Sequence, residues 1–180
     1  MRWAIVDRPA WWLLLGGIGG PLLFIVVFLI EGVTRPGYDA FRNMVSDLAM
    51  SDEGWQQIAN FIICGTLCLG LAVGLSRVWR SGPASVWGPR LVGVFGIGLI
   101  IAGVFVTDPA RGYPPGAPLT GSPQTLHGTI HGVNAIPTFA ALAAAAFVIA
   151  RRFASRGDRA WSRYSTFVGF AIVSLFIVGA

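Results

Sequence analysis

Charge is scarce in this chain: of its 180 residues 12% are charged, whereas 54% are hydrophobic. The mean hydropathy of +0.68 does not describe a water-exposed surface, so the composition excludes a soluble domain and indicates a membrane protein. The alternation of polar and apolar residues that is typical of strands is missing too. Because only helices and closed barrels satisfy their backbone groups in lipid, the sequence predicts a helical protein.

Lysine is absent, and all thirteen basic residues are arginine. Ten of them lie before the first apolar segment, between the second and third, or between the fourth and fifth. Only Arg35, Arg42 and Arg111 lie in the alternate loops. Since arginine is enriched on the cytoplasmic side of membranes, this asymmetry predicts a cytoplasmic N-terminus. The arginines that orient the chain in the membrane also account for the formal charge of +5. We therefore expect no nucleic-acid partner.

Five apolar segments are long enough to cross about 30 Å of hydrocarbon as helices. We place these spans at about residues 11–30, 58–79, 91–107, 130–150 and 164–180, with outer loops at 31–57 and 108–129. The prediction is a single membrane domain over residues 1–180, an all-α polytopic transmembrane helical bundle. Its five spans begin at a cytoplasmic N-terminus and end at a C-terminus outside.

The N-terminal apolar segment could serve as a cleaved signal peptide, since arginines precede it. Its apolar run is too long for that, and no small-x-small cleavage site follows Ile30. We therefore predict that it is retained as a span. The expected location is a bacterial cytoplasmic (inner) membrane, where the multi-pass protein contacts membrane lipids.

Only two histidines occur, His127 and His131, one turn apart at the start of the fourth span. Asn134 and Thr138 continue the same spacing, so all four side chains lie on one helical face. A second polar stripe follows the second span. Its members are Gln57, Asn60 and Cys64. Because unpaired polar groups facing lipid are unfavourable, the two stripes are expected to face each other within the bundle.

Two histidines at this spacing can bind one metal ion together, and Asp108, at the end of the third span, is the candidate third ligand. A His-His-Asp set with an open position is typical of catalytic zinc, which activates a bound water and polarises a carbonyl or phosphoryl oxygen. No glutamate follows His127 as in the His-Glu-x-x-His motif. Asp47 is therefore the predicted base and Ser46 a predicted hydrogen-bond donor to substrate. The hypothesis is a metal-dependent hydrolase of a lipid-like substrate.

Four further polar residues are candidate substrate-binding groups. They are Asn60, Asn134, Arg42 and Arg111. Arginine recognises lipid phosphates by bidentate hydrogen bonds, and Arg35 could do the same. The alternative is that the arginines of the outer loops anchor the chain at the interface or pair with Asp39 and Asp47.

Two alternatives to the hydrolase stay open. In the first, His127, His131 and Asp108 form a hydrogen-bonded cluster that ties the proline-rich loop to the bundle without a metal. In the second, the protein is not an enzyme and binds a lipid, a partner or a small solute through its polar stripes. Haem is disfavoured, because histidines on one helix face cannot ligate both faces of a porphyrin.

Four stretches together resemble the domain-of-unknown-function family 998, whose members are polytopic and mostly prokaryotic membrane proteins. They are RPGYDAFRNMVSDLAM, GWQQIANFIICG, GVFVTDPARGYPPG and HGTIHGVNAIPTF. The resemblance runs from about Trp11 to the C-terminus and implies a fold without an established activity. The positions that it carries over are Ser46, Gly54, Trp55, Asn60, Asp108, Pro109, His127 and His131.

Members of that family usually have six spans, whereas the fifth predicted span of this chain ends at Ala180. The resemblance therefore implies a truncated member, or a bundle that an oligomer or a partner helix completes. The combination of a Ser, an Asp and a His-x-x-x-His is also similar to the intramembrane hydrolases that include alkaline ceramidases and adiponectin receptors. Those have seven spans and a third histidine ligand, and this chain has only two histidines.

Overall fold

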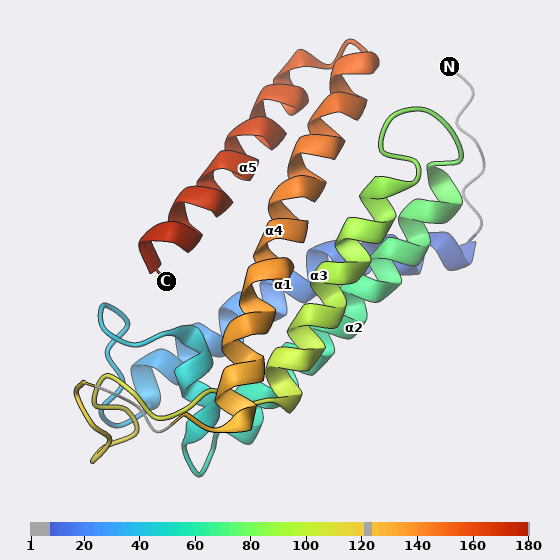
Figure 1. Ribbon diagram of the computed structural model, residues 1–180. Coiled ribbons are helices and arrows are strands. Elements are labelled where there is room, and N and C mark those ends of the chain that lie inside the picture. The colour runs from blue at the N-terminus through green and yellow to red at the C-terminus, as the bar shows by residue number, and fades with distance from the viewer. Residues whose placement is uncertain (1–7, 121–123, 180) are drawn as a thin grey trace.

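The computed structural model describes residues 8–120 and 124–179, which fold into five long α-helices and one short 3-10 helix (Figure 1). In chain order they are α1 (Arg8–Thr34), η1 (Val45–Met50), α2 (Trp55–Val78), α3 (Trp87–Val104), α4 (Leu126–Ser155) and α5 (Arg159–Gly179). Each α-helix is long and apolar enough to cross a membrane, and the described residues form no strand. The predicted all-α fold with five spans is confirmed.

Several helices continue beyond the predicted apolar spans. The fourth begins at Leu126 rather than near residue 130, and the fifth begins at Arg159 rather than near residue 164. The extra turns contain polar residues. Because the spans were placed by their hydropathy, these polar turns fall outside them although the helix continues through them. Ala180, the last residue of the predicted fifth span, lies outside the described residues.

The helices form a row in which each packs on its neighbours in the chain. Extensive contact joins α1 to α2, α2 to α3, α3 to α4 and α4 to α5 in the described part of the chain. Figure 1 shows α5 beside α4. The helix α3 therefore separates α2 from α4, and this separation decides which polar stripes can meet.

Glycines allow the closest of these contacts. A Cβ atom on Gly65 of α2 would lie 2.6 Å from the carbonyl oxygen of Gly96 in α3, and a Cβ atom on Gly16 of α1 would lie 2.8 Å from that of Leu67 in α2. Real side chains do not occupy such short distances, so backbone packs on backbone at both places. Between α3 and α4, a Cβ atom on Gly98 would collide with the Thr138 side chain.

Two long loops meet at one end of the bundle, which we call the loop end. It contains the ends of α1 and α3 and the beginnings of α2 and α4 (Figure 1). The rings of Tyr38 and Tyr113, one from each loop, pack edge to face with centroids 5.6 Å apart. The Asn43 side-chain amide donates a hydrogen bond to the Arg111 carbonyl at 3.3 Å. The loops therefore support each other.

At the opposite end, Arg152 of α4 holds the connection between α2 and α3. Its guanidinium donates to the carbonyl oxygens of Ser81 at 3.0 Å and Pro83 at 2.7 Å. The same group lies 4.7 Å from the ring centroid of Trp79, in a cation–π contact. Arg152 is buried. An arginine in the basic segment therefore has a structural role besides any role in membrane orientation.

Candidate functional site

The polar face of α4 packs on the second half of α3. The Nδ1 atom of His131 lies 2.8 Å from the carbonyl oxygen of Phe105, and the amide of Asn134 donates to the Gly98 carbonyl at 2.9 Å. Phe105 is the C-cap of α3, so its carbonyl has no partner within the helix. His131 supplies that partner. The predicted shared face of α4 is confirmed, but the expectation that it meets the stripe on α2 is wrong, because α3 lies between them.

Asp108 fixes the beginning of α4. Its carboxylate accepts hydrogen bonds from the Thr125 backbone N–H at 2.9 Å and from the Thr125 hydroxyl at 2.6 Å. Thr125 is the N-cap residue of α4, and its hydroxyl oxygen accepts from the N–H of Gly128. These hydrogen bonds hold the pKa of Asp108 below its ordinary value. Asp108 therefore ties its loop to the beginning of α4 through Thr125, whereas the hydrogen bond of His131 goes to the Phe105 carbonyl. A hydrogen-bonded cluster of His127, His131 and Asp108 stays a prediction.

His127 is the second histidine of the predicted ligand set. Its side chain is exposed, and its ring faces that of Phe105 with centroids 5.2 Å apart. A shallow cleft of about 340 Å³ runs beside it on the surface of α4. Its lining residues are Thr107, Asp108, Ala110, Gln124, Gly128, Thr129, Gly132 and Val133.

Asp47, the predicted base, is buried at the loop end with 1% of its surface exposed. Its Oδ2 atom accepts from the Met44 N–H at 2.9 Å and from Arg111 Nη2 at 3.3 Å. Burial raises the pKa of Asp47, although the Met44 N–H, Arg111 and the charge of His131 each lower it. The pairing of an outer-loop arginine with Asp47, one of the sequence alternatives, is confirmed.

The remaining predicted residues of the loops lie around this pair. Ser46 is half-buried on η1, next to Asp47, and Arg42 is exposed in the segment before η1. Asn134 lies on the face of α4 that packs on α3, whereas Asn60 lies on α2 and faces α1. The structure therefore does not gather the candidate substrate-binding groups into one place.

The predicted zinc ligands do not fit a metal ion in the described structure. Among residues 8–120 and 124–179, no group of three or more His, Cys, Asp and Glu side chains could hold one. The Asp108 carboxylate is engaged by Thr125, and Asp47 by Met44 and Arg111. Zinc binding by His127, His131 and Asp108 therefore stays a prediction from sequence, and we derive no chemistry from it.

A second polar cluster lies between α1 and α2; the sequence named Arg35 and Asn60 as candidate binding residues but did not predict that they belong to one cluster. Its centre is Arg35, whose Nη2 atom donates to Glu31 Oε1 at 2.7 Å, to the Glu53 carbonyl at 2.6 Å and to Gln56 Oε1 at 3.0 Å. The Arg35 guanidinium also donates to the Ser51 hydroxyl. The signal in the sequence is the spacing of Glu31 and Arg35, four residues apart at the end of an apolar segment.

Asn60 extends this polar region deeper along α2. Its amide nitrogen donates to the Phe24 carbonyl at 3.2 Å and to Gln57 Oε1 at 3.0 Å. Glu31 and Asn60 are each only 2% exposed. Glu31 Oε2 and Asn60 Oδ1 are nevertheless buried oxygens without a hydrogen-bond partner in the described structure. Buried polar atoms normally have a partner, so these two oxygens need an explanation.

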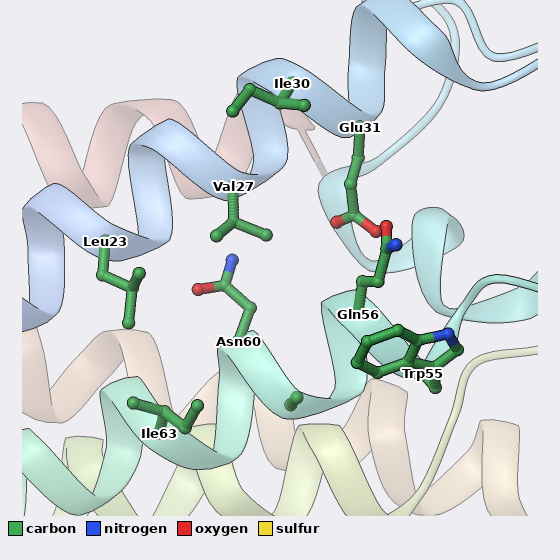
Figure 2. Close-up of a pocket in the computed structure, with 9 residues that line it drawn as sticks. Leu23, Val27, Ile30, Glu31, Trp55, Gln56, Asn60 and Ile63 are labelled. Atoms are coloured by element: carbon green, nitrogen blue, oxygen red, sulfur yellow. The ribbon is translucent and has the colours of Figure 1, made fainter.

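The same two residues line a cleft of about 310 Å³ between α1 and α2. The lining residues are Leu23, Val27, Ile30, Glu31, Trp55, Gln56, Ala59, Asn60 and Ile63. Figure 2 shows Leu23 and Ile63 at one end of the cleft, Glu31, Gln56 and Trp55 at the other, and Val27 and Asn60 between them. The cleft therefore has an apolar part deeper in the span and a polar part near the loop end. We call it the α1–α2 cleft.

Comparison with known proteins places the chain in a family. A family model described as "Protein of unknown function (DUF998)" matches residues 18–180, and the chain belongs to this family. This confirms the resemblance found in the sequence. No curated protein and no solved structure matches the chain. Together with the five membrane-length helices, the family indicates a multi-pass integral membrane protein of unknown function.

Proposed function

We propose that this member of the DUF998 family binds a membrane lipid in the α1–α2 cleft and acts without catalysis. The observation that carries the proposal is a cleft with apolar walls that ends at two buried, unpartnered oxygens. Its volume of about 310 Å³ lies at the lower end of the range of about 300–1,000 Å³ that is typical of ligand sites. An amphiphile is the class of ligand that matches both parts of this lining.

The depth of the cleft in the span suits a lipid. Glu31 lies in the last turn of the membrane-length segment Trp11–Thr34, and Trp55 begins the next such segment. Tryptophan at the end of a span is typical of the headgroup region. The polar part of the cleft is therefore expected at headgroup level, with the apolar part among the acyl chains.

The walls of the cleft also give a route of entry. Leu23, Ile30 and Ile63 line the cleft, and their side chains are exposed on the surface of the helix row. In a membrane such a surface faces lipid, so a lipid can enter sideways between the helices. The arginine distribution predicts that the loop end lies outside a bacterial inner membrane. The bound lipid would then come from the outer leaflet.

The metal-dependent hydrolase suggested by the sequence is the other candidate. It needs three ligands around one ion, and the described side chains do not form such a group. The α1–α2 cleft, in contrast, is a space of about 310 Å³ in the described structure. Lipid binding is therefore the function that the geometry supports best.

Narrowing the cleft tests the proposal. The variant Ile63→Trp puts a larger side chain on its apolar wall, and Ile97→Trp on α3 is the matched control, because Ile63 and Ile97 are similarly exposed, at 46% and 51%. Lipid that remains bound after gentle detergent extraction is quantified by mass spectrometry. We expect Ile63→Trp to lose the bound lipid and Ile97→Trp to keep it. Equal lipid content in the two variants and the wild type would contradict the proposal.

A further inference from the structure

The α1–α2 cleft also indicates the chemistry of the headgroup that it accepts, an inference that rests on the proposed lipid binding. We infer that the cleft selects a lipid whose headgroup carries a primary ammonium, of the phosphatidylethanolamine type, and that this ammonium donates a hydrogen bond to Glu31 Oε2. The inference starts from the two oxygens that lack a partner in the described structure, Glu31 Oε2 and Asn60 Oδ1.

The identity of the free Asn60 atom follows from its neighbours. The nitrogen of the Asn60 amide faces two acceptors, the Phe24 carbonyl and Gln57 Oε1. If the amide were turned over, its oxygen would face both acceptors and lose both hydrogen bonds. The atom left without a partner is therefore the oxygen, which is an acceptor.

Both free atoms are therefore acceptors, and the ligand must donate. An ionised carboxylate only accepts, and so does an amide oxygen. A phosphate or a carboxylate in the cleft would face these oxygens without a hydrogen to share. The nearby donors without a partner, Arg35 Nε and Gln57 Nε2, belong to residues that do not line the cleft. A ligand group with N–H or O–H hydrogens therefore supplies what the lining residues lack.

Charge favours an ammonium over a neutral hydroxyl. Arg35 contacts two carboxylates, Glu31 at 2.7 Å and Glu53 at 3.4 Å, so the cluster has more negative than positive groups. The Arg35 Nη atoms already donate to four acceptors of the protein. These are Glu31, Ser51, the Glu53 carbonyl and Gln56. Arg35 Nε is buried without a partner, but Arg35 does not line the cleft, whereas Glu31 does. An added cation in the cleft therefore meets a carboxylate that is incompletely paired.

The positions of the groups agree with a two-part ligand. Figure 2 shows the Glu31 carboxylate beside Gln56 at the polar end of the cleft, whereas Leu23 and Ile63 lie at its apolar end. An ammonium at Glu31 leaves the acyl chains to pass along the apolar wall. Asn60 lies between the two parts, where a diacyl phosphatidylethanolamine has no N–H or O–H group, so the ammonium is assigned to Glu31 Oε2 alone.

The wild-type protein gives a test that needs no variant. The purified full-length chain is incorporated into nanodiscs, and a photoactivatable lipid bound in the cleft is displaced by phosphatidylethanolamine, phosphatidylcholine or phosphatidylglycerol. The first two have the same net charge, but the trimethylammonium of phosphatidylcholine has no N–H donor. Because hydrogen bonds to charged groups are strong, we expect phosphatidylethanolamine to compete about tenfold better than phosphatidylcholine.

A substitution of Glu31 then tests whether the preference for phosphatidylethanolamine arises at this residue. In Glu31→Gln the carboxylate charge is lost with little change in shape, and Asp52→Asn is the control, since Asp52 is exposed and does not line the cleft. We expect Glu31→Gln to abolish the preference for phosphatidylethanolamine and Asp52→Asn to keep it. If the Glu31 variant does not fold, the comparison of lipids on the wild type still decides the inference.

The outcomes separate the inference from the proposed function. Equal competition by phosphatidylethanolamine and phosphatidylcholine, or stronger competition by phosphatidylglycerol, whose headgroup donates through hydroxyls, would overturn the ammonium assignment while lipid binding stands. No labelling of the cleft by the photoactivatable lipid would overturn both.

Discussion

Arg111 Nη2 lies 3.3 Å from the Oδ2 atom of Asp47, although 64 residues separate them in the chain. The pair joins the loop after α3 to η1 in the loop after α1. Because Asp47 is buried, its charge depends on these few contacts. The pair therefore holds the two loops together at the loop end, close to the beginning of α2 and the α1–α2 cleft.

Arg111→Met removes the side-chain partner of a buried carboxylate. Hydrogen bonds to charged groups contribute about 1.5–3 kcal/mol, and the partial exposure of Arg111 reduces this, so we expect a loss of about 1–2 kcal/mol of stability. Thermal unfolding in detergent, followed by near-UV circular dichroism, measures the loss. The matched control is Arg42→Met in the same end of the protein, where the side chain is exposed. Equal unfolding midpoints for the two variants would contradict a supporting role for the Arg111–Asp47 pair.

The stability of the protein is expected to depend on the titration of Asp47. Burial raises its pKa in the folded protein, so the folded state keeps a proton that the unfolded chain has lost. The stability from this group is full below the ordinary carboxyl pKa of about 4 and falls as the pH rises through the folded pKa. Asp47→Asn should remove this pH-dependent fall in stability. Thermal unfolding midpoints of the wild type and the variant, measured from below the ordinary carboxyl pKa to above the folded pKa, test this. If the unfolding midpoint of the wild type rose with pH relative to that of Asp47→Asn, the predicted direction of the effect would be contradicted.

The stability that Asp108 contributes should depend on pH in the opposite direction. Its hydrogen bonds from Thr125 lower its pKa in the folded protein. Its contribution is therefore present above the ordinary carboxyl pKa and is lost as the pH falls through the folded pKa. The difference in unfolding midpoint between the wild type and Asp108→Asn is expected to shrink on acidification. A difference that grows as the pH falls would be inconsistent with the Thr125 contacts.

Thr125→Val tests the beginning of α4. It removes the hydroxyl that caps the helix at Gly128 and donates to Asp108, and loss of such a cap costs about 0.5–2 kcal/mol. Thr129→Val is the control, since the Thr129 hydroxyl donates only to the Thr125 carbonyl in the preceding turn. We expect the Thr125 variant to unfold at a lower temperature than the Thr129 variant. A lower unfolding temperature for the Thr129 variant than for the Thr125 variant would contradict a stabilising N-cap at Thr125.

Metal content separates lipid binding from the hydrolase hypothesis. We expect elemental analysis of the gently extracted protein to find no stoichiometric zinc, because the described side chains form no ligand group of three. Stoichiometric zinc that is lost in His131→Ala would contradict this expectation and favour the hydrolase. The Phe105 carbonyl contact of His131 predicts instead that this variant lowers stability without a change in metal content.

The fold was predictable because membrane spans depend on local composition. The five apolar segments and the shared face of His131, Asn134 and Thr138 follow from hydropathy and helical spacing, and the structure contains them. Which helix each face meets depends on the order of packing, which spacing does not contain. For this reason the stripes on α2 and α4 were expected to meet, whereas α3 separates them.

The α1–α2 cleft was missed for the same reason. The spacing of Glu31 and Arg35 predicts a local ion pair, but the other contacts of Arg35 come from Gln56 of α2 and from the Glu53 carbonyl in the turn before it. A surface pair and a buried cluster have the same sequence pattern. Only the packing of α1 on α2 distinguishes them.

Photo-crosslinking is the most direct test of lipid binding in the α1–α2 cleft. A phospholipid with a diazirine in its acyl chain is bound to the full-length protein in nanodiscs and activated by light, and the labelled residues are identified by peptide mass spectrometry. We predict labels concentrated on the apolar wall of the cleft, at Leu23, Val27 and Ile63, and their loss in Ile63→Trp but not in Ile97→Trp. Labels spread evenly over the exposed faces of all five helices, and unchanged in Ile63→Trp, would contradict the account.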